Sequence, residues 1–396
     1  MRPLLTAEAR SGHVEAWHTD GASLRLDRDR LVSGGRGEWL ADATHSFDHV
    51  FGPEADARAV YDAAAARLVP GVVGGTSCTL IAYGQTSSGK TTTMLGLAGL
   101  AFEDAFARVA LAARESPARA FSLRASCIEV YNEQCHDLLT GRTGLRLFDR
   151  RAASGAAERA SATHCGEVIV EDLSSWAVAS ADEALELLHA AESRRAVGST
   201  AANDRSSRSH LVYSLRVESW PADGTEGVVR AASLQLVDLA GSERAHTHAA
   251  ESLGAEGAHI NKSLLTLGLV VSRLADASSS SGRGGPCHVP YRDSKLTRLL
   301  QSSLSGGSTT AIICTISPAT GAVEESLNTV CHTPPVPPIP PHTRGDAPRD
   351  AVCLSRHVAP RSSASPRGRA ACALWRRAPT RSALTRASSC RGYSPS

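Results

Sequence analysis

Lysine is almost absent from this chain. Of its 42 basic residues, 39 are arginines and three are lysines, at Lys90, Lys262 and Lys295. A lysine ammonium is compact and rotatable, whereas an arginine guanidinium is a planar fork, so the two groups suit different tasks. Because arginine serves wherever a generic positive charge is enough, the position of each lysine is informative.

The chain also lacks a strong charge bias, paired cysteines and long apolar runs. A formal net charge of +2 excludes wholesale binding to nucleic acid or anionic membrane, so any partner is recognised locally. The ten cysteines form no C-x-x-C pair and no histidine cluster has zinc-ligand spacing, which argues against a metal cage or disulfide scaffold and favours a reducing cytoplasm. No signal-peptide core and no run of about 18 uncharged apolar residues appears, so neither secretion nor a membrane span is expected.

Two regions of different composition can be distinguished. In residues 1–330 short β-like runs alternate with helical periodicity, which is typical of a layered α/β domain. Residues 331–396 contain 11 of the 19 prolines, and 11 arginines against two aspartates give a net charge of +9, which predicts a disordered tail. No heptad repeat is present, so dimerisation is not implied. The expected strands are 78–83, 121–130, 209–219, 230–238 and 309–316, and the expected helices are 56–68, 180–192, 261–275 and 293–304.

A phosphate-binding motif lies at residues 84–91. This run reads Gly-Gln-Thr-Ser-Ser-Gly-Lys-Thr and fits G-x-x-x-x-G-K-[ST] between an apolar strand and a helix-compatible segment. Glycines let backbone N–H groups approach phosphate oxygens, and the helix N-terminus adds the positive end of its dipole. Lys90 then reaches the β- and γ-phosphates, and Thr91 offers its hydroxyl to Mg²⁺. A plain glycine-serine turn would explain neither the lysine nor the threonine.

Two further polar segments suit a nucleotide switch. Asp238 ends the apolar run 234–237, which places its carboxylate at the carboxyl end of a strand, where Mg²⁺ is sensed in such folds. The segment 203–210 places hydroxyls, an amide and two guanidinium groups before a strand. Hydroxyls there can meet Mg²⁺ or γ-phosphate, and Arg208 can pair with a carboxylate such as Glu243. Taken alone, each segment also fits a solvated loop.

Together these segments resemble the kinesin motor domain. The segments 82–91, 203–210 and 238–243 stand in family order. The further segments that match the family are 47–51, 128–133, 137–139, 261–265 and 288–300. The resemblance covers about residues 2–330 and implies an α/β fold of the P-loop nucleoside-triphosphatase type, with a central mixed, mostly parallel sheet flanked by helices.

The resemblance also implies a site for ATP and Mg²⁺. The nucleotide contacts it implies are Arg2, Pro3, Gly84, Gln85, Thr86, Ser87, Ser88, Gly89, Lys90, Thr91 and Thr92. The catalytic residues it implies, from the first switch, the second switch and the salt bridge between them, are Ser206, Ser207, Arg208, Asp238, Gly241 and Glu243. The implied magnesium contacts are Thr91, Ser207 and Asp238, the last through water.

The implied partner is the acidic surface of the microtubule. In kinesins the segments that match this region form helices facing tubulin, and the positive side chains concerned are Lys262, Arg292, Lys295 and Arg298. They stand on a region of net charge −7, because the tail carries +9 and the whole chain +2. A local positive face on a negative domain suits electrostatic docking, although without the resemblance it would be interpreted as a solvated helix face. The expected location is the cytoplasm, on the microtubule cytoskeleton.

Two departures from the family pattern concern the coupling of chemistry to movement. The chain starts where the family's first strand, Val-x-Val-Arg-x-Arg-Pro, is finishing, and a proline run after Cys331 interrupts the last helix before the neck linker. The sequence predicts a microtubule-stimulated ATPase and motor, and two alternatives stay open. One is a protein that binds microtubules in response to nucleotide without motility, and the other is a nonfunctional partial gene product.

Overall fold

The computed structural model describes residues 1–27, 29–31, 44–149, 168–197, 205–223, 229–243, 254–279, 288–306 and 308–332. For residues 197, 254–261, 277–279 and 332 it describes the backbone alone. All of these residues fall within one unit, Met1–His357. Of the tail expected at 331–396, Cys331 and His332 end the last helix, Val323–His332, and the residues from 333 onward lie outside the described residues.

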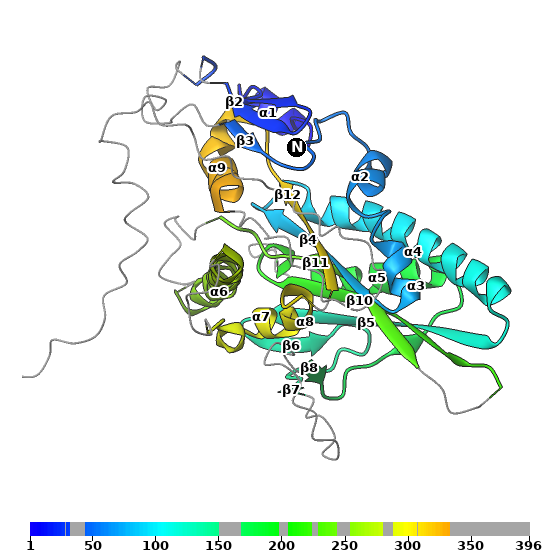
Figure 1. Cartoon of the computed structure of the whole chain (residues 1–396). Coiled ribbons are helices and arrows are strands. Elements are labelled where there is room, and N and C mark those ends of the chain that lie inside the picture. Colours follow the sequence, from blue (N-terminus) through cyan, green and yellow to red (C-terminus); the bar gives the residue numbers. More distant parts are fainter. Residues whose placement is uncertain are drawn as a thin grey trace, which may run out of the picture. The chain divides into compact units, whose positions relative to one another are not determined.

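A central sheet organises the chain (Figure 1). Its strands, in spatial order, are β12 (Ser308–Thr315), β4 (Ser77–Gly84), β11 (Arg230–Asp238), β10 (His210–Pro221), β5 (Arg119–Tyr131) and β6 (Gln134–Asp137), with β9 (Trp176–Ala177) also paired to β5. β4 pairs in parallel with β11 and β12, while β10, β6 and β9 run against their neighbours. The expected mixed sheet with mostly parallel strands is confirmed, since β12, β4, β11 and β5 share one direction.

Helices cover both faces of this sheet (Figure 1). One face carries α2 (Ala57–Ala64), α3 (Val69–Gly74), α4 (Lys90–Glu115) and α5 (Ala181–Val197), and the other carries α6 (Gly254–Ser279), α7 (Lys295–Leu299) and α8 (Gln301–Leu304). Successive residues of β4 therefore enter different cores: Leu80 packs on the α4 side and Ile81 on the α6 side. Burial on both faces explains why β4 and β12 hold the unbroken apolar runs 80–82 and 311–314.

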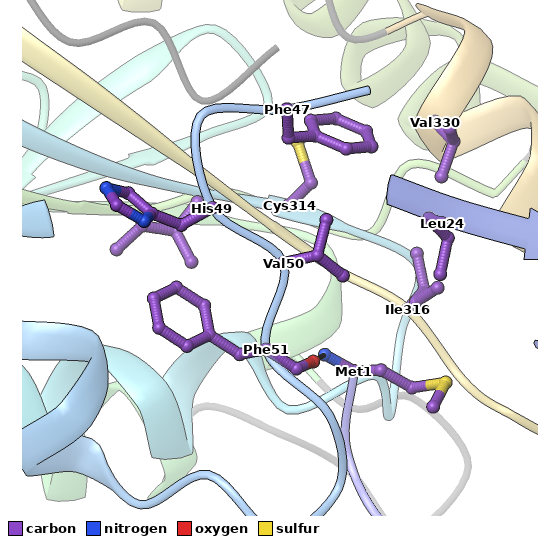
Figure 2. A pocket seen from close by; sticks show the side chains of 10 residues that line it. Met1, Leu24, Phe47, His49, Val50, Phe51, Cys314, Ile316 and Val330 are labelled. Atoms are coloured by element: carbon purple, nitrogen blue, oxygen red, sulfur yellow. Dashed lines mark hydrogen bonds between the residues drawn. The ribbon is translucent and has the colours of Figure 1, made fainter. Parts of the chain in front are cut away.

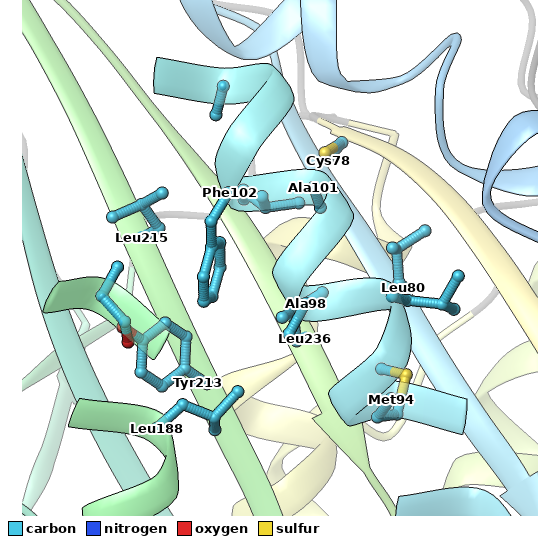
Figure 3. Close-up of a cluster of buried hydrophobic side chains, with 14 of the residues drawn as sticks. Cys78, Leu80, Met94, Ala98, Ala101, Phe102, Leu188, Tyr213, Leu215 and Leu236 are labelled. Carbon is cyan, nitrogen blue, oxygen red and sulfur yellow. The ribbon is translucent and has the colours of Figure 1, made fainter. Parts of the chain in front are cut away.

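The core on the α4 side is closely packed around aromatic rings. Figure 3 shows Phe102 of α4 beside Tyr213 and Leu215 of β10. The ring centroids of Phe102 and Tyr213 lie 5.3 Å apart in a tilted arrangement. Alanines at the contact face of α4, such as Ala98 and Ala101, let the helix approach the sheet closely. This packing fixes the first turn of α4, and hence the loop that precedes it.

Smaller elements lie outside the central sheet. They are α1 (Thr6–Arg10), the sheet of β1 (Trp17–Asp20), β2 (Ser23–Leu26) and β3 (Thr44–Ser46), the pair β7 (Leu147–Asp149) and β8 (Val168–Val170), the short turns η2 (Arg205–Ser207), η3 (Tyr291–Asp293) and η4 (Thr320–Ala322), and α9 (Val323–His332). Met1, Val50, Phe51 and Ile316 line an apolar cavity beside β12 (Figure 2). The Met1 amine donates to the Phe51 carbonyl at 2.8 Å, and the Arg2 N–H donates to the Ile316 carbonyl at 3.4 Å.

The expected strands are confirmed, and two expected helices are divided. The helix expected at 56–68 ends at Ala64, and a second one follows with Pro70 in its first turn. Proline lacks an N–H and its ring crowds the preceding turn, so one continuous helix cannot pass through this position. The helix expected at 293–304 turns at Leu300, whose φ of −84° and ψ of 3° leave the helical region.

Candidate functional site

The phosphate loop joins β4 to α4 and contains two positions, Gly84 and Gly89, that suit glycine best. A Cβ added at Gly84 would lie 2.2 Å from the carbonyl oxygen of Thr315, which is an impossible contact. Gly89, the residue before α4, has a φ of 100°, in the left-handed region that glycine adopts without strain. Ser87 shares that region with a φ of 61°. The loop therefore curls tightly in front of the α4 N-terminus, as the motif requires.

Lys90 crosses this loop from the first turn of α4. Its ammonium donates to the carbonyl oxygens of Gly84 and Gln85, both at 2.8 Å, and the residue is 7% exposed. Burial lowers the pKa of Lys90, while the carboxylates of Asp238 and Glu243 act in the opposite direction. A positive charge is thus held at the loop with two acidic groups near it.

Thr91 and Asp238 meet at the carboxyl ends of β4 and β11. The Thr91 hydroxyl donates to Oδ2 of Asp238 at 2.7 Å, and the Arg195 guanidinium donates to the same oxygen at 2.9 Å. Oδ1 of Asp238 is buried and has no hydrogen-bond partner among the described residues. A buried carboxylate oxygen without a donor is an acceptor in need of a partner, and a metal-bound water meets that need.

Arg195 is the functional residue that the sequence did not reveal. It projects from α5 with a fully buried side chain. It donates to the backbone carbonyls of Ser206 and Ser209 at 2.7 and 2.6 Å and pairs with Asp238. The guanidinium therefore ties the first-switch backbone to the acid that ends β11. Its only sequence signal is an arginine among helical residues, a pattern that usually marks a solvated face.

The second-switch segment closes onto both of its neighbours. The Gly241 N–H donates to the Ser207 carbonyl at 2.9 Å, and the Ser242 N–H donates to the Gly84 carbonyl at 3.0 Å. The Glu243 carboxylate accepts hydrogen bonds from the N–H and the hydroxyl of Thr86. These bonds bring the phosphate loop and both switches together.

Gly241 lies at this junction, where an added side chain would displace the contact between Glu243 and Thr86. A Cβ there would lie 2.2 Å from Oε1 of Glu243 and 2.4 Å from the Thr86 hydroxyl. The contact between Glu243 and Thr86 was not foreseen from the sequence, and the salt bridge between Arg208 and Glu243 stays a prediction. Asn203 and Asp204, at the start of the first-switch segment, lie outside the described residues.

Of the two N-terminal residues assigned to nucleotide contact, Arg2 reaches the phosphate loop. Arg2 donates through Nε to the Ser87 carbonyl at 2.7 Å and forms a two-oxygen pair with Glu8. Hydrogen bonds from Arg2 are the largest cause that lowers the pKa of Glu8 to about 2. The Pro3 carbonyl accepts from Arg2 at 2.8 Å, and Thr92 is exposed in the first turn of α4.

The four residues assigned to the microtubule lie on the opposite face from α4, in α6, η3 and α7 (Figure 1). Arg292 and Arg298 donate to the two carboxylate oxygens of Asp149, at 2.8 and 3.2 Å. The Glu133 carboxylate accepts from the Lys295 N–H at 2.9 Å and so caps α7. Lys262 is exposed on α6. The face carries positive charge, part of it already paired with Asp149.

A glycine-rich loop between a parallel strand and a helix, with a lysine, a threonine and a strand-end aspartate beside it, defines a P-loop nucleotide-binding domain. Comparison with known families narrows this class. The model described as "Kinesin motor domain" matches residues 1–334. The chain belongs to the kinesin family, whose members are P-loop ATPases that bind microtubules.

Curated relatives match most of this chain. It is 42% identical over 338 residues to "Kinesin-like protein KIN-7K, chloroplastic" of Arabidopsis thaliana and 41% identical over 337 residues to "Kinesin-like protein KIN-7E, chloroplastic" of Oryza sativa subsp. japonica. Each match covers 83% of this chain but only 32% and 26% of the relative, so the chain spans about a third or less of their length. Another relative, 41% identical, is "Kinesin-like protein KIN-7C, mitochondrial" of Arabidopsis thaliana. Because these names differ in compartment, the cytoplasmic location stays a prediction.

A solved structure shares the fold. The structure titled "Structure of a fast kinesin: Implications for ATPase mechanism and interactions with microtubules" superimposes with a TM-score of 0.68 at 29% sequence identity, over 84% of this chain and 88% of that one. Among the described residues, none of the helices combines the length and the apolar composition that a membrane span needs.

Proposed function

We propose that this chain hydrolyses ATP with Mg²⁺, that microtubules stimulate the hydrolysis, and that the cycle drives movement along them. The observation that carries the proposal is the meeting of three loops at one point, through the bonds of Ser207 to Gly241, Gly84 to Ser242 and Thr86 to Glu243. Loops that can close on a γ-phosphate from three sides are what phosphoryl transfer requires, because its catalysis is mainly positioning and electrostatic stabilisation.

Each side chain has a role that its position supports. Lys90 supplies the ammonium for the β- and γ-phosphates, and its two carbonyl partners hold it at the loop. Thr91 suits Mg²⁺, and Oδ1 of Asp238, which has no hydrogen-bond partner in the described part of the chain, suits a water bound to it. When bound, Mg²⁺ would neutralise charge on the phosphate oxygens. Ser207 and Glu243, one from each switch, would close behind the γ-phosphate and order the attacking water.

Microtubule binding is assigned to the α6 and α7 face. Lys262 is exposed and Arg292 has 78% of its side chain exposed, so both can meet an acidic surface without rearrangement of the core. The cellular location that follows is the microtubule cytoskeleton of the cytoplasm.

The proposal is tested by steady-state ATP hydrolysis with and without stabilised microtubules. We expect slow basal turnover and at least tenfold stimulation, with Lys90→Ala as the inactive control. Turnover that matches Lys90→Ala under both conditions would overturn the enzymatic part of the proposal.

A gliding assay separates the motor from its alternative. Directional gliding on a surface coated with the chain supports movement. Stimulated hydrolysis with nucleotide-dependent cosedimentation but no gliding favours a microtubule-binding protein without motility. A nonfunctional partial product is excluded by a cooperative melting transition together with ATP binding.

A further inference from the structure

His210 uses both nitrogens of a fully buried ring. It is the first residue of β10 and is 2% exposed. Its Nδ1 accepts the N–H of Ala240 at 2.9 Å, and its Nε2 lies 2.7 Å from the hydroxyl oxygen of Ser263. A buried imidazole in the core is commonly just a satisfied polar group. The two partners of this ring, Ala240 and Ser263, indicate a functional role as well.

The geometry assigns the ring one tautomer. Since Nδ1 accepts a backbone N–H, it carries no proton, and a neutral ring then holds its proton on Nε2 and donates it to Ser263. Burial lowers the pKa of His210 to about 3, with the positive charges of Arg195 and Lys90 acting in the same direction. The ring is therefore a neutral connector of fixed length across physiological pH, with one acceptor end and one donor end.

The two ends of the ring belong to different functional segments. Ala240 precedes Gly241, whose N–H bonds to the first-switch residue Ser207. Ser263 follows Lys262 on α6, the helix of the proposed microtubule face. Ala240 and Ser263 are both buried. A displacement of the second-switch backbone is thus transmitted to the Ser263 side chain through two hydrogen bonds and a rigid ring.

We propose that His210 is a positioning residue that couples the second-switch backbone to α6, so that nucleotide state and microtubule affinity depend on one another through the Ala240–His210–Ser263 chain. This inference rests on the proposed function, because it takes α6 as the microtubule-binding helix. Coupling between two ligand sites is reciprocal: whatever change nucleotide makes to microtubule affinity, microtubules make to nucleotide affinity. The ring acts on this coupling rather than on either site alone.

Three variants interrupt the chain at different bonds. Ser263→Ala removes the acceptor for Nε2–H. His210→Asn keeps an oxygen near the Nδ1 position for the Ala240 N–H but cannot reach Ser263. His210→Gln reaches towards Ser263 but loses the acceptor at Nδ1. The matched control is Thr266→Ala, because the Thr266 hydroxyl is also buried in α6 but donates to the Lys262 carbonyl within the same helix.

The measurement is the ratio of microtubule dissociation constants in ADP and in a non-hydrolysable ATP analogue, obtained by cosedimentation. We expect Ser263→Ala, His210→Asn and His210→Gln each to shrink the wild-type ratio at least threefold, while Thr266→Ala keeps it within a factor of two. The double variant His210→Asn with Ser263→Ala should be no worse than the stronger single variant, since both break one connection. The ATP affinity of each variant is measured as well, to check that a smaller ratio of dissociation constants does not result from weaker nucleotide binding.

The outcomes separate this inference from the proposed function. A wild-type chain that does not bind microtubules overturns the proposed function and, with it, this inference. A wild-type chain whose affinity responds to nucleotide, together with folded Ser263→Ala and His210→Asn proteins that keep the full ratio, overturns the coupling role alone and leaves His210 as a core residue. Should His210→Asn not fold, Ser263→Ala decides the question, because it leaves the ring and its bond to Ala240 in place.

Discussion

The nucleotide loops and the α6–α7 face are built in different ways. At the loops, charged groups are buried and bonded to one another: Arg195 is fully buried, and Asp238 has 3% of its side chain exposed. At the other face, the side chain of Arg292 is 78% exposed and its partner Asp149 is 37% exposed. The fold fixes the geometry of the first region, whereas the second is defined by charge at a surface.

This difference sets the expected energies. Removing one member of a buried ion pair leaves an uncompensated charge and costs about 3–5 kcal/mol, whereas an exposed pair contributes about 0–1 kcal/mol and weakens with salt. Variants at the loops should therefore cause large losses of stability and activity that depend little on salt concentration. Variants at the α6–α7 face should cause small losses of microtubule affinity that depend on salt concentration.

Arg195→Met gives the largest expected effect. It leaves the buried Asp238 carboxylate without its cation and removes the donor to the Ser206 and Ser209 carbonyls. We expect the free energy of unfolding, measured by urea denaturation, to fall by about 3–5 kcal/mol. Arg146→Met is the matched control, because its pair with Glu171 is 72% and 42% exposed. Similar losses in the two variants would show that the contrast between the regions is wrong.

Lys90→Ala gives the second-largest expected effect, a loss of ATP affinity. It removes a charge-assisted contact to phosphate that is worth about 1.5–3 kcal/mol, so ATP affinity should fall at least tenfold. Titration with a fluorescent ATP analogue measures this. Lys295→Ala is the control, since Lys295 lies on the opposite face from α4 and should leave ATP affinity as it is. Unchanged affinity in Lys90→Ala would reduce the loop to a structural turn.

The contrast also explains which site residues could be predicted. The phosphate loop is contiguous in sequence, so its residue types and spacing carry the chemistry in one motif. Asp238 was predicted because a carboxylate directly after an apolar run stands at a strand end. Arg195 could not be predicted, because its partners come from β11 and from the segment before β10 and are assembled only by the fold.

The same reasoning applies to the fold. Strands β4 and β12 hold unbroken apolar runs, since helices cover both faces of the sheet, and the bounds of β4, β11 and β12 were predicted to within about a residue or two. The bounds of the short helices were harder to predict. Leu300 looks like one more apolar residue in a helical period, yet it turns the backbone between α7 and α8. Periodicity records which face is buried and does not record where the chain bends.

Glu243→Ala should affect turnover more than nucleotide binding. The carboxylate holds Thr86 of the phosphate loop, and the family resemblance assigns it a salt bridge with Arg208 in the closed state. We expect microtubule-stimulated turnover to fall at least tenfold, about 1.4 kcal/mol, with ATP affinity changed by less than threefold. Thr86→Ala and Arg208→Ala identify the partner that matters, because the relevant one should reproduce the loss. Wild-type stimulated turnover in Glu243→Ala would remove this residue from the mechanism.

The buried ring of His210 predicts a pH dependence of stability. Its folded pKa of about 3 lies below the ordinary value of 6.5, so between these values the unfolded chain binds a proton that the folded protein does not. The contribution to stability is fully present above pH 6.5 and falls by about 1.4 kcal/mol for each unit of pH below it. Urea denaturation at pH 7.5, 6.0 and 5.0 measures the slope, and His210→Gln should show a slope smaller by one proton. Equal slopes would mean that the ring titrates normally in the folded protein.

The smallest expected effect belongs to the exposed face. Replacing Lys262 and Lys295 together by alanine should weaken microtubule cosedimentation by about 0.4–2 kcal/mol, roughly twofold to thirtyfold, and flatten its salt dependence without a change in ATP affinity. Asp149→Asn should act in the opposite direction, because it removes the carboxylate paired with Arg292 and Arg298 and frees two positive charges for an acidic partner. If this face binds by charge, the microtubule affinity at low salt should be lower than wild type in the double lysine variant and higher in Asp149→Asn. The three affinities should become equal as the salt concentration is raised. Binding that keeps its strength and salt slope in both would place the microtubule contact elsewhere on the domain.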